Sequence, residues 1–188
     1  MKKVLFGGSF NPPTIAHYEI INYLATSQLY DEILILPNGD TYEFGGKSLN
    51  NFDHRVKMLH LMCNHLPNVK ILEIENQEEF LGTAHTLKLL NHPTFVIGAD
   101  CLDHLHLWKN FETLINENQF LVFARSSLQD VHRIILNNPN LKAYDQHFTI
   151  VDLKTSDVSS SEFRLTKNEK MVKDEVLEYI KSNHLYGF

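Results

Sequence analysis

The stretch Val4–His17 (VLFGGSFNPPTIAH) decides the fold, because it joins a short apolar run to the opening of a helical pattern. Val4–Phe6 is continuously apolar, as expected for a strand that is covered on both faces. Gly7 and Gly8 let the backbone approach a ligand closely, and the two prolines delay the start of the helix. We therefore interpret the stretch as a strand–turn–helix unit.

Similar units recur along the whole chain. The predicted strands are Val4–Phe6, Ile33–Leu36, Val69–Ile74, Thr94–Ile97, Phe120–Phe123 and Phe148–Leu153. Apolar stripes with helical spacing lie between them and after them: Ile20, Ile21, Leu24 and Ala25; Val56, Leu59, Met62 and Cys63; Leu87 and Leu90; Val131, Ile134 and Ile135; Val172, Val176, Leu177 and Ile180. Alternating strands and helices predict an α/β fold with a doubly wound parallel sheet. We expect residues 1–188 to form a single domain with a C-terminal helical segment.

Composition narrows the class of protein. The chain has 188 residues, of which 43% are hydrophobic, and this length suits one globular core. Its net charge of -6 argues against binding to nucleic acid, although a few placed cations could still hold a small anion. Cys63 and Cys101 are too few for a disulfide framework, and no apolar run could span a bilayer. We expect a soluble, cytoplasmic protein with no membrane partner.

Two polar motifs suit phosphate binding. Thr14 and His17 are three residues apart, so at a helix start they share a face near the main-chain N–H groups of the first turn. The alternative is a capping threonine beside a solvated histidine. Near the other end of the chain, Val158–Arg164 (VSSSEFR) places serines at a helix start and a guanidinium one turn later. Its alternative is an ordinary capped helix with a surface arginine.

The segment containing GGSFNPPTIAH resembles the G-G-[ST]-F-[DN]-P-x-[HT]-x-x-H signature of nicotinate/nicotinamide mononucleotide adenylyltransferases. These enzymes belong to the nucleotidyltransferase superfamily with an H-x-G-H or T-x-G-H motif. Two positions depart from the pattern: Thr14 stands where many bacterial members have histidine, and Ala16 replaces glycine. VSSSEFR is similar to the family's I-S-S-T-x-I-R, and Gly98-Ala99-Asp100 followed by Trp108 is similar to its G-x-D and tryptophan.

The resemblance implies a Rossmann-like nucleotidyltransferase fold and a role for each matching residue. Catalysis would involve His17, Thr14 and Arg164. ATP would be bound by Gly7, Gly8, Ser9, Phe10, Gly98, Asp100, Ser159, Ser160, Ser161 and Arg164. The mononucleotide would be bound by Asn11, Lys47, Arg55, Thr83, Thr86, Trp108 and Arg125, with Trp108 stacked on the pyridine ring.

The predicted reaction joins ATP to nicotinate or nicotinamide mononucleotide and releases pyrophosphate. Mg²⁺ would enter with ATP and keep mostly water ligands, so no metal site made of protein side chains is expected. The stretch Asp103–His106 contains ligand-type residues without the spacing of a zinc site. Two alternatives remain open: a pantetheine-phosphate adenylyltransferase, and a non-catalytic nucleotide sensor of the same fold. The sequence does not determine which of the two mononucleotides is preferred or what the stretch Asn38–Asn50 does. It also leaves open whether the chain forms a homo-oligomer.

Overall fold

Six strands alternate with helices in a computed structural model that describes residues 1–40, 51–76, 81–124 and 128–188. The strands are β1 (Lys3–Gly8), β2 (Glu32–Pro37), β3 (Val69–Ile71), β4 (Thr94–Gly98), β5 (Phe120–Phe123) and β6 (Phe148–Val151). The sheet order β3-β2-β1-β4-β5-β6 confirms the predicted doubly wound α/β class. In these ranges no helix has both the length and the apolar character needed to cross a membrane.

Of the helices in the described residues, five follow the predicted stripes, one follows the helix start predicted in Val158–Arg164, and one was not predicted. The helices are α1 (Ile15–Thr26), α2 (Phe52–Cys63), α3 (Thr83–Leu89), α4 (Phe111–Glu117), α5 (Leu128–Asn137), α6 (Ser160–Thr166) and α7 (Asp174–Ser182). Short 3₁₀ turns are η1 (Ala99–Cys101), η2 (Leu105–Leu107), η3 (Lys142–His147), η4 (Glu169–Met171) and η5 (Leu185–Gly187). The stripe analysis did not predict α4, and it extended the last helix back to Val172, which is buried but precedes α7.

Two strands end before the residue at which the sequence predicted their ends, because charged residues follow them. β3 stops at Ile71, because charged residues Glu73 and Glu75 follow and Ile74 is 37% exposed. β6 stops at Val151, because Asp152 follows directly. Strands between buried neighbours match the prediction more closely: all six residues of β2 are buried.

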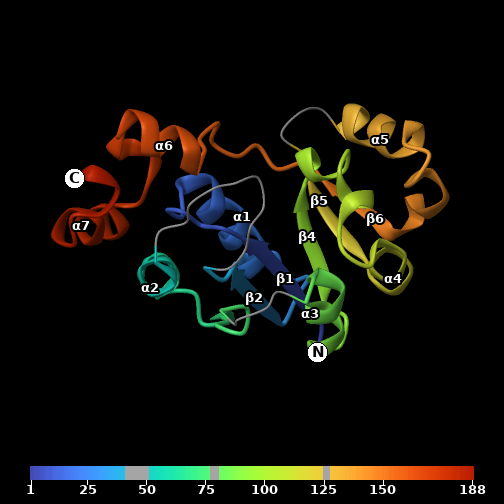
Figure 1. Ribbon diagram of the computed structural model, residues 1–188, viewed down its shortest axis with the longest axis horizontal. Coiled ribbons are helices and arrows are strands. Elements are labelled where there is room, and N and C mark those ends of the chain that lie inside the picture. Colours follow the sequence, from blue (N-terminus) through green and yellow to red (C-terminus); the bar gives the residue numbers. More distant parts are fainter. Residues whose placement is uncertain (41–50, 77–80, 125–127) are drawn as a thin grey trace. The chain divides into compact units, whose positions relative to one another are not determined.

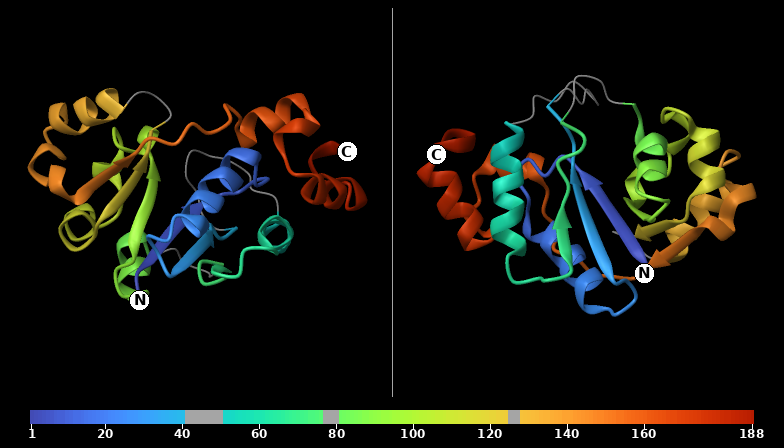
Figure 2. Two further views of the ribbon diagram at one scale, coloured as in Figure 1. Left: turned by 180° about the vertical axis from the view of Figure 1, so that it is seen from behind. Right: turned by 90° about the horizontal axis from the view of Figure 1, so that it is seen from below.

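The described chain divides into two compact units. Unit 1 comprises Met1, Gly8–Phe80 and Thr155–Phe188, and unit 2 comprises Lys2–Gly7 and Leu81–Lys154. In unit 1, β2 pairs with β3 in parallel, α1 contacts β2, and α2 contacts both strands. α7 lies alongside α2, as Figure 2 shows in its right-hand view.

Unit 2 is built around parallel strands whose register aligns aromatic side chains. β1 pairs with β4, β4 with β5, and β5 with β6. Figure 1 shows β4, β5 and β6 side by side, and α5 packs next to β6. Phe95 is the direct partner of Phe120, and Phe120 of Phe148, so their ring centroids lie 6.4 and 5.1 Å apart. Cross-strand aromatic pairs of this kind stabilise the register of a sheet.

Candidate active site

The turn after β1 is shaped by close packing of an aromatic ring on Gly8, the last residue of the strand. A Cβ atom on Gly8 would lie 3.3 Å from Cζ of Phe10, closer than most side chains tolerate. Phe10 itself is fully buried and has a φ of 46°, a left-handed conformation that is uncommon for a residue of its size. The buried ring therefore anchors the turn, and the chain leaves it directly into the start of α1.

The start of α1 holds His17 in one orientation. Thr14 is the N-cap, and its main-chain N–H donates to Nδ1 of His17 at 2.9 Å. The Thr14 hydroxyl lies 2.8 Å from the same nitrogen, and the Phe10 ring meets the imidazole edge-on at 5.1 Å between centroids. Because a main-chain N–H can only donate, Nδ1 is the acceptor and the ring proton of the neutral imidazole is on Nε2. Thr14 is fully buried, whereas His17 is half-buried.

The second motif docks on the first within unit 1. Ser159 caps α6 by accepting from the main-chain N–H of Glu162 at 3.1 Å. The Ser160 hydroxyl donates to the carbonyl oxygen of Pro12 at 2.8 Å. Because this bond uses the only hydroxyl proton of Ser160, its side chain ties α6 to the turn after β1.

Arg164 strengthens the same junction. Its Nη1 donates to the carbonyl oxygen of Asn11 at 2.5 Å, and its Nη2 donates to the Ser161 hydroxyl at 3.2 Å. These two bonds use two of the five N–H groups of the guanidinium. Residues that are more than 150 positions apart in sequence are thus brought into contact, and a phosphate could meet both motifs at once.

A carboxylate that the sequence analysis did not single out holds the segment leading into α6. Both oxygens of Glu19 accept hydrogen bonds from Ser156, one from its main-chain N–H and one from its hydroxyl, each at 2.6 Å. Glu19 lies on α1, two residues after His17. The helix that carries the histidine and the segment that carries the serines are therefore joined at a second point.

Arg55 is the largest fully buried side chain of the described residues. It donates to the carbonyl oxygen of Ser9 at 2.8 Å and to Oδ1 of Asp40 at 3.1 Å. Burial lowers the pKa of Arg55, and the hydrogen bond and charge of Asp40 oppose that shift, as does the nearby Tyr186. The guanidinium thus braces the turn after β1 from inside the protein.

The residues predicted to read the nucleoside and the pyridine ring lie in unit 2. Gly98 ends β4, and a Cβ atom there would collide with Oδ1 of Asp100, so the exposed Asp100 carboxylate folds back over the glycine. Trp108 is half-buried and meets the Phe95 ring edge-on at 6.2 Å between centroids. Thr83 opens α3 and is half-buried, whereas Thr86 is only 6% exposed.

Two predicted binding residues, Lys47 and Arg125, lie outside the described residues. The remaining candidates fall into two sets. The set in unit 1 is Gly8, Ser9, Phe10, Asn11, Thr14, His17, Arg55, Ser159, Ser160, Ser161 and Arg164, and the set in unit 2 is Gly7, Thr83, Thr86, Gly98, Asp100 and Trp108. Contacts between the first and second motifs are therefore contacts within unit 1.

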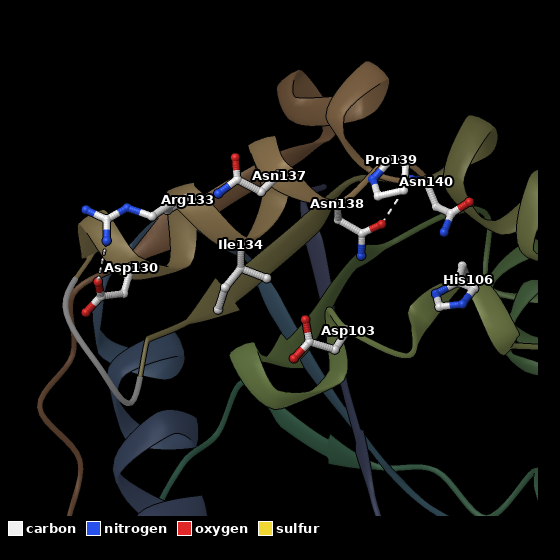
Figure 3. Close-up of a pocket in the computed structure, with 9 residues that line it drawn as sticks. All are labelled: Asp103, His106, Asp130, Arg133, Ile134, Asn137, Asn138, Pro139 and Asn140. Carbon is white, nitrogen blue, oxygen red and sulfur yellow. Dashed lines mark hydrogen bonds and ion pairs between the residues drawn. The ribbon is translucent and has the colours of Figure 1, made fainter.

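Unit 2 also contains a cavity of about 610 Å³ that none of these candidates lines. Figure 3 shows its polar lining, in which Asp130 and Arg133 of α5 form an ion pair at 3.8 Å. His106 also lines it, and its Nδ1 is buried without a hydrogen-bond partner in the described chain. A search of the described residues finds no group of three or more His, Cys, Asp or Glu side chains that could hold a metal ion.

The chain is similar to known proteins over nearly its whole length. The model of the cytidylyltransferase-like family matches residues 5–166. A relative from Acholeplasma laidlawii, named "Probable nicotinate-nucleotide adenylyltransferase", is 38% identical over 189 residues, covering 97% of this chain and 96% of the relative. The nicotinate-nucleotide adenylyltransferase of Bacillus subtilis is 29% identical over 99% of both chains.

The fold is also found among solved structures. The nicotinic acid mononucleotide adenylyltransferase of Plasmodium falciparum, complexed with NaAD, superposes with a TM-score of 0.77. The match covers 100% of this chain and 98% of that chain at 21% sequence identity. At this identity the likeness shows a shared fold.

Proposed function

This chain belongs to the cytidylyltransferase-like family and to the nicotinate-nucleotide adenylyltransferases, and we propose that it transfers the adenylyl group of ATP to nicotinate mononucleotide in NAD biosynthesis. A phosphate oxygen of the mononucleotide attacks the α-phosphorus of ATP and forms a new P–O bond. The bond from the α-phosphorus to the oxygen bridging to the β-phosphate breaks, and pyrophosphate leaves with the electron pair. The observation that carries this proposal is the docking of Arg164 and Ser160 on the turn that leads to His17.

The chemistry needs positioning and charge stabilisation rather than a covalent intermediate on the enzyme. We assign the central role to His17, whose Nε2–H donates to an oxygen on the α-phosphorus as negative charge builds up there. Thr14 acts through His17, because its main-chain N–H and hydroxyl both lie at Nδ1 and its side chain is buried. The N-terminus of α1 adds its partial positive charge.

We assign Arg164 to binding of the β- and γ-phosphates, because its two hydrogen bonds leave three guanidinium N–H groups available. Ser159 and Ser161 would bind the same phosphates. Replacing Arg164 with lysine keeps the charge but removes the planar fork, so we expect KM for ATP to rise about tenfold or more. KM for the mononucleotide should stay the same in steady-state kinetics. The matched control is Arg133→Lys, because Arg133 is an exposed arginine on α5, outside the candidate site. A rise in KM for the mononucleotide alone would show that Arg164 serves the other substrate.

Arg55 was predicted to bind the mononucleotide, but its burial and its bonds to Ser9 and Asp40 support a positioning role. Arg55→Lys cannot span both partners, and the loss of about 1–3 kcal/mol should lower the melting temperature by roughly 2–12 °C. Circular dichroism would measure this shift, and kinetics should show a lower kcat. An unchanged melting temperature with a raised KM for the mononucleotide would instead support direct binding.

The proposed roles in unit 2 concern recognition of the nucleotides. Asp100 accepts hydroxyl hydrogens of a ribose, with Gly98 leaving room for the carboxylate beside the backbone. Trp108 stacks on the pyridine ring, and Thr83 and Thr86 contribute to recognition of its carboxyl group. For Gly7, Gly8, Ser9 and Phe10 the proposal is close approach of the backbone to ATP. Asn11 was predicted to bind the mononucleotide, but it is only 2% exposed and both its Oδ1 and its carbonyl oxygen accept hydrogen bonds within the protein, so we propose a positioning role for it.

Magnesium belongs to the substrate in this proposal, since it arrives bound to the phosphates of ATP. Mg²⁺ bound to a nucleotide is held mainly by phosphate oxygens and water. We propose a reducing, cytoplasmic setting, because two cysteines are too few for the disulfide framework of a small secreted protein.

Pyrophosphate release with different acceptors tests the proposed function. Nicotinate mononucleotide, nicotinamide mononucleotide and phosphopantetheine would each be supplied with ATP and Mg²⁺. We expect release with a pyridine mononucleotide. Release with phosphopantetheine alone would support the pantetheine-phosphate alternative, and ATP binding without any release would support a nucleotide sensor.

A further inference from the structure

The 3₁₀ turn η5 brings a tyrosine to the active-site turn. The hydroxyl of Tyr186 donates to Oδ1 of Asn11 at 2.9 Å, across a separation of 175 residues. Asn11 is only 2% exposed and Tyr186 is half-buried, so this bond is partly shielded from competing water. The carbonyl oxygen of the same asparagine accepts the bond from Arg164. Asn11 is thus held through its side chain by Tyr186 and through its main chain by Arg164.

The backbone at Tyr186 is in the left-handed region. Tyr186 has a φ of 55°, between His184 at 51° and Gly187 at 83°. A left-handed conformation is unfavourable for any residue with a Cβ atom, and it persists where the surroundings hold it in place. The Phe163 ring of α6 provides that support, because it meets the Tyr186 ring edge-on at 6.0 Å between centroids.

Tyr186 also lies near the buried arginine beneath the same turn. A coulombic effect of Tyr186 raises the pKa of Arg55, against the dominant effect of burial, which places the phenol group near the guanidinium. Arg55 in turn donates to the carbonyl oxygen of Ser9, two residues before Asn11. One aromatic side chain therefore lies close to α2, α6 and the turn after β1 at once.

We propose that Tyr186 is a positioning residue of the active site, whose hydroxyl fixes Asn11 and thereby aligns His17 with the phosphate-binding side chains of α6. This inference rests on the proposed function, because it assigns Tyr186 a part in the same reaction. The residue acts through Asn11 and touches no substrate. Its loss should therefore slow turnover without removing a binding contact.

Tyr186→Phe removes the hydroxyl and keeps the ring against Phe163. We expect kcat to fall about 3- to 10-fold, the range of one partly shielded hydrogen bond, with both KM values within about twofold. Hydrogen exchange at the amides between Ser9 and His17 should become faster. The matched control is Tyr179→Phe, since Tyr179 is also half-buried and its hydroxyl bonds to Nδ1 of His54 at 2.8 Å, away from this turn.

The control should lose similar thermal stability and keep kcat within about twofold of the wild-type value. In an Asn11→Ala background, Tyr186→Phe should cause no further fall in kcat, because the two residues act through one bond. Equal losses of kcat in the two tyrosine variants, or unchanged exchange near Asn11, would overturn the proposal. A wild-type chain that uses no acceptor would refute the proposed function instead, and the exchange comparison would still decide whether Tyr186 holds the turn.

Discussion

Replacing His17 with alanine is expected to lower kcat by about 10²- to 10⁴-fold, the range for one charge-stabilising donor. In the proposed mechanism, the Nε2–H of the imidazole donates to the α-phosphoryl oxygens as negative charge develops on them. ATP affinity should change far less, because we assign binding of the rest of the triphosphate to Arg164 and the serines at the start of α6. Single-turnover kinetics would measure the chemical step directly, and equilibrium binding would measure the affinity.

The structure offers a control that separates chemistry from helix capping. His17 occupies the third position of α1 and accepts from the N-cap residue, so His17→Ala also removes a capping interaction. His17→Glu creates the sequence Thr-x-x-Glu, in which the carboxylate can accept the same bond but cannot donate to a phosphate. We expect the glutamate variant to keep the wild-type melting temperature and to be as inactive as the alanine variant. Recovery of more than about half of kcat in either variant would contradict the catalytic assignment.

Replacing Trp108 with alanine is expected to weaken mononucleotide binding about 5- to 150-fold. An indole stacked on a pyridine ring should contribute about 1–3 kcal/mol, by analogy with stacking of aromatic side chains on nucleobases. ATP binding should be nearly unchanged, which isothermal titration calorimetry would show for each ligand separately. Trp108→Phe keeps an aromatic face near Phe95 and should show an intermediate loss.

Trp108 also reports on binding by itself, because it is the only tryptophan of the chain. Nicotinate mononucleotide should quench its fluorescence, and phosphopantetheine should leave it unchanged. The substrate assignment would be wrong if no pyridine mononucleotide changed the tryptophan fluorescence and the protein turned over phosphopantetheine. The fold and the chemistry at phosphorus would then still stand.

The fold was largely predictable because its strands are buried. β2 and β5 consist entirely of buried residues, and such strands appear in sequence as continuous apolar runs. The sequence did not reveal α4, because this helix is short and its two buried residues, Leu114 and Ile115, are adjacent and show no helical spacing. The early ends of β3 and β6 depend on charged residues that follow each apolar run.

The site was predictable where motifs are local and unpredictable where partners are distant. Thr14 and His17 lie within one helical turn, so their spacing reveals that they meet. The bond from Tyr186 to Asn11 spans 175 residues, and the one from Ser156 to Glu19 spans 137. Neither tyrosine nor glutamate carries a local pattern that would identify its partner. The burial of Arg55 likewise depends on packing that only the folded chain provides.

The fate of the α-phosphorus of ATP tests the central claim most directly. ATP radiolabelled at that atom would be incubated with the enzyme, Mg²⁺ and nicotinate mononucleotide, and the products separated. The account predicts that the label enters the dinucleotide in equal amount to the unlabelled pyrophosphate released, with none on the protein. Label that stays in ATP, becomes attached to the protein, or is transferred only when phosphopantetheine is the acceptor would contradict it.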